Sequence, residues 1–215
     1  MKPRKYQLII FDWDGTIIDS QAHIIASMKN AILDEHLPIP GDDSIRHIIG
    51  LSLERAILGL FPELKQPVVD RIAENYRKHF FADMNRSELF EGVAETIQDL
   101  HASGYFLAVA TGKGRKGLDL ALRNTGLEPF FHITRCADET RSKPDPLMLD
   151  EILTDLDLNA ESAIMVGDTS YDMDMAGNIK MDSVAVTYGM HDRQLLMSSN
   201  PTYFIDSIDQ LSQYV

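Results

Sequence analysis

The stretch Phe11-Asp12-Trp13-Asp14-Gly15-Thr16 directly follows the apolar residues Leu8-Ile9-Ile10, and it decides how the rest of the chain is interpreted. The apolar run predicts a short buried strand that ends at Phe11. Side chains alternate along an extended chain, so Asp12 and Asp14 are expected on the same side, and Gly15 permits a sharp exit from the strand. Open α/β sheets bind ligands at the carboxyl ends of their strands. The pair therefore predicts a site in which one carboxylate attacks and the other transfers a proton, with an ordinary Asp-Gly turn as the alternative.

Polar groups come after three further strand-like runs in the same way. They are Thr111-Gly112-Lys113 after residues 105–110, Ser142-Lys143-Pro144 after residues 132–136, and Gly167-Asp168 with Asp172 after residues 163–166. Each of these motifs is weak alone, because Thr and Asp commonly cap helices and form turns. Four of them in one order form a constellation that predicts an active site.

In this order the four motifs resemble those of the haloacid dehalogenase superfamily of phosphohydrolases. That family has an Asp-x-Asp-x-Thr motif, a strand-end Thr or Ser, a Lys before Pro, and a Gly-Asp with a second Asp nearby, and the combination is specific. The general pattern is most similar to phosphoglycolate-phosphatase-like members with a small helical cap. The resemblance implies a small phosphorylated metabolite as substrate, such as a phosphoglycolate-like compound or a sugar phosphate, without identifying it.

The periodicity of the sequence divides the chain into an α/β part and a helical part. From about residue 90 onward, strand-like runs alternate with helical patterns, which predicts a Rossmann-like parallel sheet flanked by helices. Between Thr16 and about residue 90 no convincing β run is present, and apolar residues recur at helical spacing. We therefore expect a catalytic core of residues 1–18 and 90–215, with residues 19–89 inserted as an α-helical cap.

Composition excludes some partners and compartments. The 215 residues carry a formal charge of -13, which would repel nucleic acid and anionic lipid surfaces. Cys136 is the single cysteine, so no intrachain disulfide can form. The basic N-terminus lacks the apolar stretch of a signal peptide, and no run reaches transmembrane length. We expect a cytoplasmic protein, monomeric or homodimeric, that binds neither nucleic acid nor membranes.

The residue types of the motifs suit phosphoryl transfer. Phosphate monoesters resist attack because their oxygens are negative, so a carboxylate nucleophile needs a cation and a frame that aligns the displacement. Asp12 is the predicted nucleophile, which forms an aspartyl-phosphate, and Asp14 is the predicted acid and base. Mg²⁺ prefers oxygen ligands, and Asp12, the Asp14 backbone carbonyl and Asp168 would supply them. Asp172 is expected to support these ligands from behind.

Other residues are predicted to bind the phosphoryl group. Thr111 would donate its hydroxyl and neighbouring N–H groups, including that of Gly112, to the phosphoryl oxygens. Lys143 would hold the nucleophile and the phosphoryl group as a compact positive charge. The remaining candidates are Thr16, which would support the loop or bind a phosphoryl oxygen, and Lys113 at the rim. Residues 46–55 form a predicted specificity segment that bends at Gly50, with Arg46 or Arg55 as the anion contact.

Two other functions are compatible with the same motifs. A phosphomutase of the same superfamily would bring a cap histidine shortly after the first motif, but Ile24 occupies the aligned position and His23 is one residue out of step. A catalytically weak regulatory protein that binds a phosphometabolite could keep the fold, although intact Asp12, Asp14 and Lys143 argue against it. Phosphatase is therefore the predicted function.

Overall fold

The computed structural model describes residues 4–82 and 87–215. Within these residues the chain forms a six-stranded sheet in which every neighbouring pair is parallel, with the order β5-β4-β1-β6-β7-β8. The strands are β1 (Leu8–Phe11), β4 (Phe106–Thr111), β5 (Ile133–Cys136), β6 (Ala163–Gly167), β7 (Asp182–Val186) and β8 (Tyr203–Ile205). The predicted Rossmann-like α/β class is confirmed.

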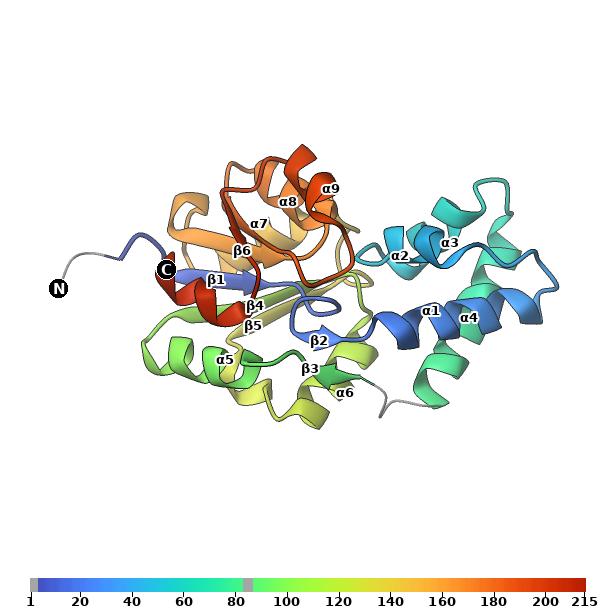
Figure 1. The fold of residues 1–215 in the computed structure, drawn as a ribbon, viewed down its shortest axis with the longest axis horizontal. Helices are drawn as coiled ribbons and strands as arrows, with labels where there is room; N and C mark the ends of the chain where they lie inside the picture. The colour runs from blue at the N-terminus through green and yellow to red at the C-terminus, as the bar shows by residue number, and fades with distance from the viewer. Residues whose placement is uncertain (1–3, 83–86) are drawn as a thin grey trace.

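Helices cover both faces of this sheet (Figure 1). They are α5 (Val93–Ala102), α6 (Arg115–Thr125), α7 (Leu147–Asp155), α8 (Ser170–Gly177) and α9 (Arg193–Ser198). In β1, Ile9 and Phe11 belong to the hydrophobic cluster that contains residues of α5 and α6, whereas Leu8 and Ile10 belong to the cluster that contains residues of α7 and α8. A strand buried on both faces reads as a continuous apolar run, which explains the pattern from Leu8 to Phe11.

The strand register brings the motifs together. Phe11 pairs with Val109 of β4 and with Val166 of β6. Asp12 follows Phe11 by one residue, while Thr111 and Asp168 each follow their paired valine by two. The three side chains therefore emerge at the same carboxyl edge of the sheet.

A second group of helices lies between the first and second motifs and extends to one side of the sheet (Figure 1). They are α1 (Gln21–Asp34), α2 (Asp42–His47), α3 (Leu53–Leu60) and α4 (Gln66–Ala82). Their apolar residues form a separate cluster around Met28, Ile57 and Ile72. This agrees with the helical texture of the sequence, and the division at residues 18/19 and 89/90 stays a prediction.

The prediction that no strand lies between Thr16 and residue 90 is wrong. Strands β2 (Ile18–Asp19) and β3 (Glu88–Leu89) form an antiparallel pair where the chain enters and leaves the helical group. Strands of two residues are too short to show an alternating pattern, so the sequence carries no signal for them.

Candidate active site

Four charged side chains meet in the interior at the carboxyl edge of the sheet. Lys143 Nζ lies 2.6 Å from Asp12 Oδ1 and 2.6 Å from Asp172 Oδ1. Asp168 stands beside them, and one carboxylate oxygen from each of the three aspartates lies within 4.8 Å of the others. All four side chains are buried, so a single ammonium group faces three carboxylates with little solvent to screen them.

Local structure fixes Asp12 and Asp172. The Asp12 backbone N–H donates to the Val166 carbonyl at 2.9 Å, which continues the pairing of β1 with β6. Asp172 occupies the third position of α8, where its Oδ2 accepts from the Thr169 N–H at 3.0 Å and from the Thr169 hydroxyl at 2.7 Å. Gly167 is required here, because a Cβ atom at that position would lie 2.4 Å from Asp172 Cβ.

Asp168 is held by both of its oxygens. Its Oδ1 accepts from the Thr16 hydroxyl at 2.9 Å, and its Oδ2 accepts from the Met190 N–H at 2.8 Å. Gly15 has a φ of +89°, and a Cβ there would come within 2.1 Å of Asp168 Oδ2. The Gly-Thr pair of the first motif therefore positions Asp168. The two roles predicted for Thr16, support of the loop or binding of a phosphoryl oxygen, stay predictions.

Burial dominates the electrostatics of this cluster. Desolvation raises the pKa of Asp12 to about 7, with the Lys143 charge acting in the opposite direction and the Asp172 charge adding to the rise. Desolvation also raises the pKa of Asp168, and the charges of Asp12 and Asp172 add to it. Burial alone would lower the pKa of Lys143, but the neighbouring carboxylates Asp12 and Asp172 raise it above its usual value, so the ammonium stays protonated. The cluster as a whole has an excess of negative charge.

This donor set fits a divalent cation. The ligands on offer are carboxylate oxygens, which Mg²⁺ prefers. Asp12 Oδ2 is buried and has no hydrogen-bond partner among the described residues, and a buried carboxylate oxygen without a partner is unfavourable. A bound cation would satisfy that oxygen and balance the excess negative charge.

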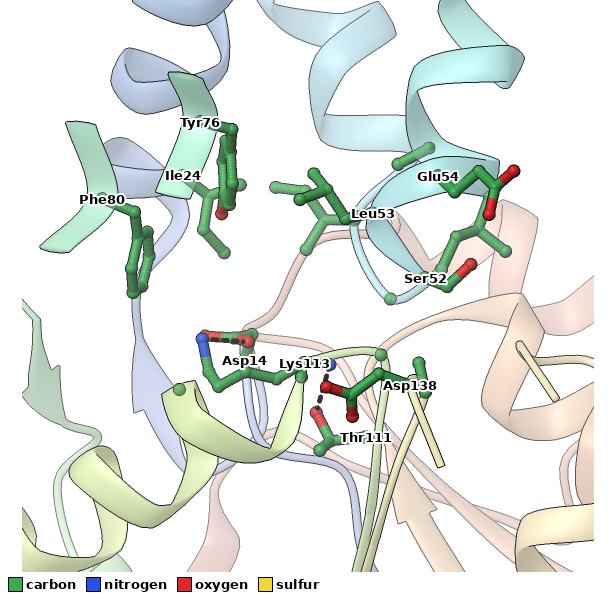
Figure 2. Close-up of a pocket in the computed structure, with 18 of the residues that line it drawn as sticks. Asp14, Ile24, Ser52, Leu53, Glu54, Tyr76, Phe80, Thr111, Lys113 and Asp138 are labelled. Carbon is green, nitrogen blue, oxygen red and sulfur yellow. Dashed lines mark hydrogen bonds and ion pairs between the residues drawn. The ribbon is translucent and has the colours of Figure 1, made fainter. Parts of the chain in front are cut away.

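Asp14 lies apart from the buried cluster and faces the helical group. Its Oδ1 accepts from the Ser20 hydroxyl at 2.7 Å, and its Oδ2 lies 2.9 Å from Lys113 Nζ. Figure 2 shows the ion pair between Asp14 and Lys113. The same ammonium stands 4.5 Å from the centroid of the Phe80 ring. Lys113, which the sequence predicts at the rim, thus connects Asp14 to α4. The contact of Ser20 with Asp14 was not predicted, because Ser20 belongs to none of the four motifs.

Thr111 and Gly112 end strand β4 beneath the helical group. The buried Thr111 hydroxyl accepts from the Lys113 N–H at 3.2 Å. A Cβ at Gly112 would lie 2.4 Å from the Gly50 carbonyl oxygen and 2.5 Å from that of Leu51. Gly50 itself has a φ of +102°, in agreement with the predicted bend. Gly112 therefore allows the loop at residues 50–51 to lie directly against the end of β4.

A cavity of about 390 Å³ opens above these groups (Figure 2). Its lining includes Asp12, Asp14 and Thr111 from the sheet edge and side chains of α1, α3 and α4 from the helical group. The structure does not bring Arg46 to this cavity. Its Nη1 pairs with Asp43 Oδ1 at 2.8 Å on α2. In this conformation Arg46 therefore does not reach the cavity, and its contact with the substrate stays a prediction.

The helical group is anchored to the sheet by contacts that the sequence did not indicate. The His47 carbonyl at the end of α2 accepts from the Tyr171 hydroxyl at 3.0 Å and lies 3.1 Å from His191 Nε2. His191 Nδ1 accepts from the Ser170 N–H, so the Nε2 atom carries the proton and donates. The Ser52 N–H donates to the Ser142 hydroxyl at 2.8 Å.

None of the helices in residues 4–82 and 87–215 has both the length and the hydropathy that a membrane crossing requires. A parallel sheet with carboxylates and one lysine gathered at its carboxyl edge, beneath a helical insert, defines an α/β enzyme whose site handles charged oxygens. Comparison with known proteins makes this class specific. Residues 9–186 match the model of the haloacid dehalogenase-like hydrolase family, and the chain belongs to that family.

The relatives and structures that the chain matches agree with this membership. The "Probable phosphatase IndB" of Dickeya dadantii (strain 3937) is 32% identical and covers 98% of this chain and 92% of its own length. The phosphoglycolate phosphatase of Vibrio parahaemolyticus serotype O3:K6 (strain RIMD 2210633) is 26% identical over 100% of this chain and 98% of its own. A haloacid dehalogenase-like hydrolase from Bacteroides fragilis superposes with a TM-score of 0.90 at 25% identity, over 96% of this chain and 100% of that one. A phosphoric monoester hydrolase is the enzyme class that these findings support.

Proposed function

We propose that the chain is a Mg²⁺-dependent phosphatase that hydrolyses a small phosphomonoester through an aspartyl-phosphate on Asp12. The observation that supports this most is the ion pair of Lys143 with Asp12 at the floor of a cavity whose wall carries a second carboxylate, Asp14. Lys143 favours the charged, nucleophilic form of Asp12. Asp14 accepts a hydrogen bond from Ser20 and not from Lys143, so the two carboxylates have different surroundings and can take different roles.

In the first step a carboxylate oxygen of Asp12 attacks the phosphorus atom. The bond between phosphorus and the alcohol oxygen breaks as the bond to Asp12 forms, and Asp14, in its protonated form, gives its proton to the departing alkoxide. The Thr111 hydroxyl and the N–H of Gly112 would donate to the phosphoryl oxygens, and Lys143 would oppose their negative charge.

In the second step water attacks the phosphorus atom of the aspartyl-phosphate. Asp14, now a carboxylate, takes a proton from this water, and the bond between phosphorus and Asp12 breaks. Inorganic phosphate leaves, and both aspartates return to their starting states. Lys113 and Ser20 would hold the Asp14 side chain toward the cavity, and the Lys113 charge would favour its carboxylate form in the second step.

The metal would be held by Asp12, Asp168 and the Asp14 backbone carbonyl. Asp172, which is bonded to Thr169 and Lys143, would support them from behind. When bound, Mg²⁺ would supply charge neutralisation for the phosphoryl oxygens. The protein contributes the fixed carboxylates and the buried setting in which that charge is effective.

The test is phosphate release from a panel of small phosphomonoesters, including phosphoglycolate, sugar phosphates and nucleotides, together with pyrophosphate. We expect turnover that requires Mg²⁺, stops with chelator, and falls by about a thousandfold or more in Asp12→Asn. Wild-type turnover by Asp12→Asn, with deamidation to aspartate excluded by mass spectrometry, would overturn the role of Asp12. Transfer of phosphate between positions of a sugar would favour the mutase alternative, and binding without turnover would favour the regulatory one. The cytoplasmic location and the monomeric or homodimeric state stay predictions.

A further inference from the structure

The part of the cavity that would hold the alcohol portion of a substrate is built from apolar side chains of the helical group. Figure 2 shows Tyr76 and Phe80 of α4 with Ile24 of α1 on one side, facing Leu53 of α3 across the opening. The lining from the helical group also includes Met28 and, beside Leu53, the carboxylate residue Glu54. The polar groups Asp14, Thr111 and Lys113 lie at the opposite end, on the sheet side.

The cations that line the cavity are either paired already or exposed to solvent. Lys113 is paired with Asp14 at 2.9 Å, and Lys116 and Arg77 line the cavity with exposed side chains. Among the described residues that line the cavity, none adds a buried cation from the helical group. A leaving group with its own carboxylate or phosphate would lose hydration against this apolar wall, and the exposed charges of Arg77 and Lys116 would offset that loss only weakly because solvent screens them.

Tyr76 is the ring that remains available to a ligand. Phe80 already has ring partners in His23, stacked at 4.3 Å, and in the Lys113 ammonium at 4.5 Å. For Tyr76 the only ring contact among the described residues is Phe80, at 5.6 Å with an interplanar angle of 25°.

The hydroxyl group of Tyr76 is also available to a ligand. No hydrogen bond to it is present within the described part of the chain, and Figure 2 shows it directed toward the sheet side of the cavity. Burial raises the pKa of Tyr76, and the negative charge of Asp14 adds to the rise, so the group is a neutral donor.

We propose that the substrate is a phosphomonoester whose alcohol carries a neutral aromatic ring, packed between Tyr76 and Leu53, with a ring acceptor atom bonded to the Tyr76 hydroxyl. This rests on the proposed phosphatase function and narrows its substrate class. The cavity volume of about 390 Å³ falls in the range of sites that enclose an organic ligand. The prediction departs from phosphoglycolate, whose leaving group is small and anionic.

The test compares alcohols of similar leaving ability, so that only recognition differs. We would measure kcat/KM with Mg²⁺ for benzyl phosphate, cyclohexylmethyl phosphate and phosphoglycolate, and for 3-pyridylmethyl phosphate in mildly alkaline buffer, where its ring is neutral. Benzyl phosphate should exceed cyclohexylmethyl phosphate by about three- to tenfold, the range of an aromatic pair beyond its apolar area. It should exceed phosphoglycolate by a larger factor, and the pyridyl compound should exceed the benzyl compound by about threefold, the value of one added neutral hydrogen bond.

Variants of Tyr76 assign the effect. Tyr76→Leu should bring the ratio of benzyl to cyclohexylmethyl phosphate to about one. Tyr76→Phe should keep that ratio and remove the advantage of the pyridyl compound. Tyr214→Leu is the matched control, because Tyr214 is a partly buried tyrosine that packs against Tyr203 and does not line the cavity, and it should change neither ratio.

The outcomes separate this inference from the function on which it rests. Turnover of the saturated compound or of phosphoglycolate equal to that of benzyl phosphate would overturn the aromatic subsite and leave the phosphatase intact. If no phosphomonoester is hydrolysed, the phosphatase function fails, and calorimetry with benzylphosphonate against cyclohexylmethylphosphonate still tests the subsite. Equal affinity for the two phosphonates, or a preference that survives in Tyr76→Leu, would overturn it.

Discussion

Lys143 is the residue on which the charge balance of the site depends. It is fully buried and is the one cation in contact with Asp12 and Asp172 among the described residues, while Asp168 adds a third carboxylate nearby. The sequence could indicate these four residues because each belongs to a polar motif that comes after a strand, and because the order of the motifs resembles that of one family. It could not predict that Asp172 shares the lysine, since that contact depends on how α8 begins.

Lys143→Ala is expected to destabilise the protein at neutral pH. Removing one partner of a buried ionic cluster leaves the others uncompensated, which costs about 3–5 kcal/mol. Urea unfolding would measure the loss, with Lys78→Ala as the control. Lys78 forms an exposed pair with Glu74 at 2.9 Å, and such a pair contributes about 0.3–0.5 kcal/mol. Equal losses in the two variants would show that Lys143 does not compensate the cluster.

In the presence of chelator, Asp12→Asn is expected to stabilise the protein, in contrast to Lys143→Ala, and the size of this effect should depend on pH. Because the folded-state pKa of Asp12 is raised to about 7, its stabilising contribution is present at low pH and is lost as the pH rises through that value. Asn does not ionise, so the variant should be more stable than the wild type by about 1–3 kcal/mol above the pKa, and the difference should vanish in acid. Urea midpoints at several pH values would measure this.

Magnesium provides the control for that experiment. A cation that binds the folded state stabilises it according to its concentration relative to Kd. Mg²⁺ should therefore stabilise the wild type at neutral pH and remove the advantage of Asp12→Asn. An advantage that is independent of pH, or unchanged by Mg²⁺, would contradict the link between the Asp12 charge, the metal and stability.

At the scale of elements, the sequence predicts those helices and strands that are long enough to show a hydrophobic period. Most strands of the six-stranded sheet appear as apolar runs, although β5 contains Thr134 and Arg135. Helix α6 ends just before Gly126, which has a φ of +69° as expected of a helix-terminating glycine. Strands β2 and β3 were missed because their pairing involves two residues each. The antiparallel pair is a product of tertiary structure, since it joins Ile18 to Leu89 across the whole helical insert.

The turn after β4 gives a prediction at this scale. Gly112→Ala would place a Cβ atom within 2.4 Å of the Gly50 carbonyl oxygen, so the loop at residues 50–51 would be displaced from the sheet edge. We expect kcat/KM to fall by about tenfold or more while circular dichroism is unchanged. Gly177→Ala is the matched control, because a Cβ there meets no atom within 4 Å and alanine favours the end of α8. Unchanged activity in Gly112→Ala would show that the close approach is not needed for catalysis.

For the molecule as a whole, the decisive relation is how the helical group sits on the sheet. Motifs and periodicity cannot predict this relation, because it depends on the backbone carbonyl of His47. That carbonyl accepts hydrogen bonds from Tyr171 and His191. The rings of His47 and His191 are stacked at 5.1 Å, which adds to the same contact. Neither Tyr171 nor His191 belongs to one of the four motifs, although Tyr171 immediately precedes Asp172.

Tyr171→Phe tests whether this anchor sets the closure of the cavity. The substitution removes one hydrogen bond to the His47 carbonyl and keeps the aromatic contacts of the ring. An exposed neutral hydrogen bond contributes about 0.5–1 kcal/mol, so we expect kcat/KM to fall by about two- to fivefold and amide exchange in α2 to rise. Tyr214→Phe, at a tyrosine without such a bond, should change neither quantity. A loss of global stability without faster exchange in α2 would mean that Tyr171 supports the core alone, and the cavity would then be closed by the contacts of Gly112 and Ser142 instead.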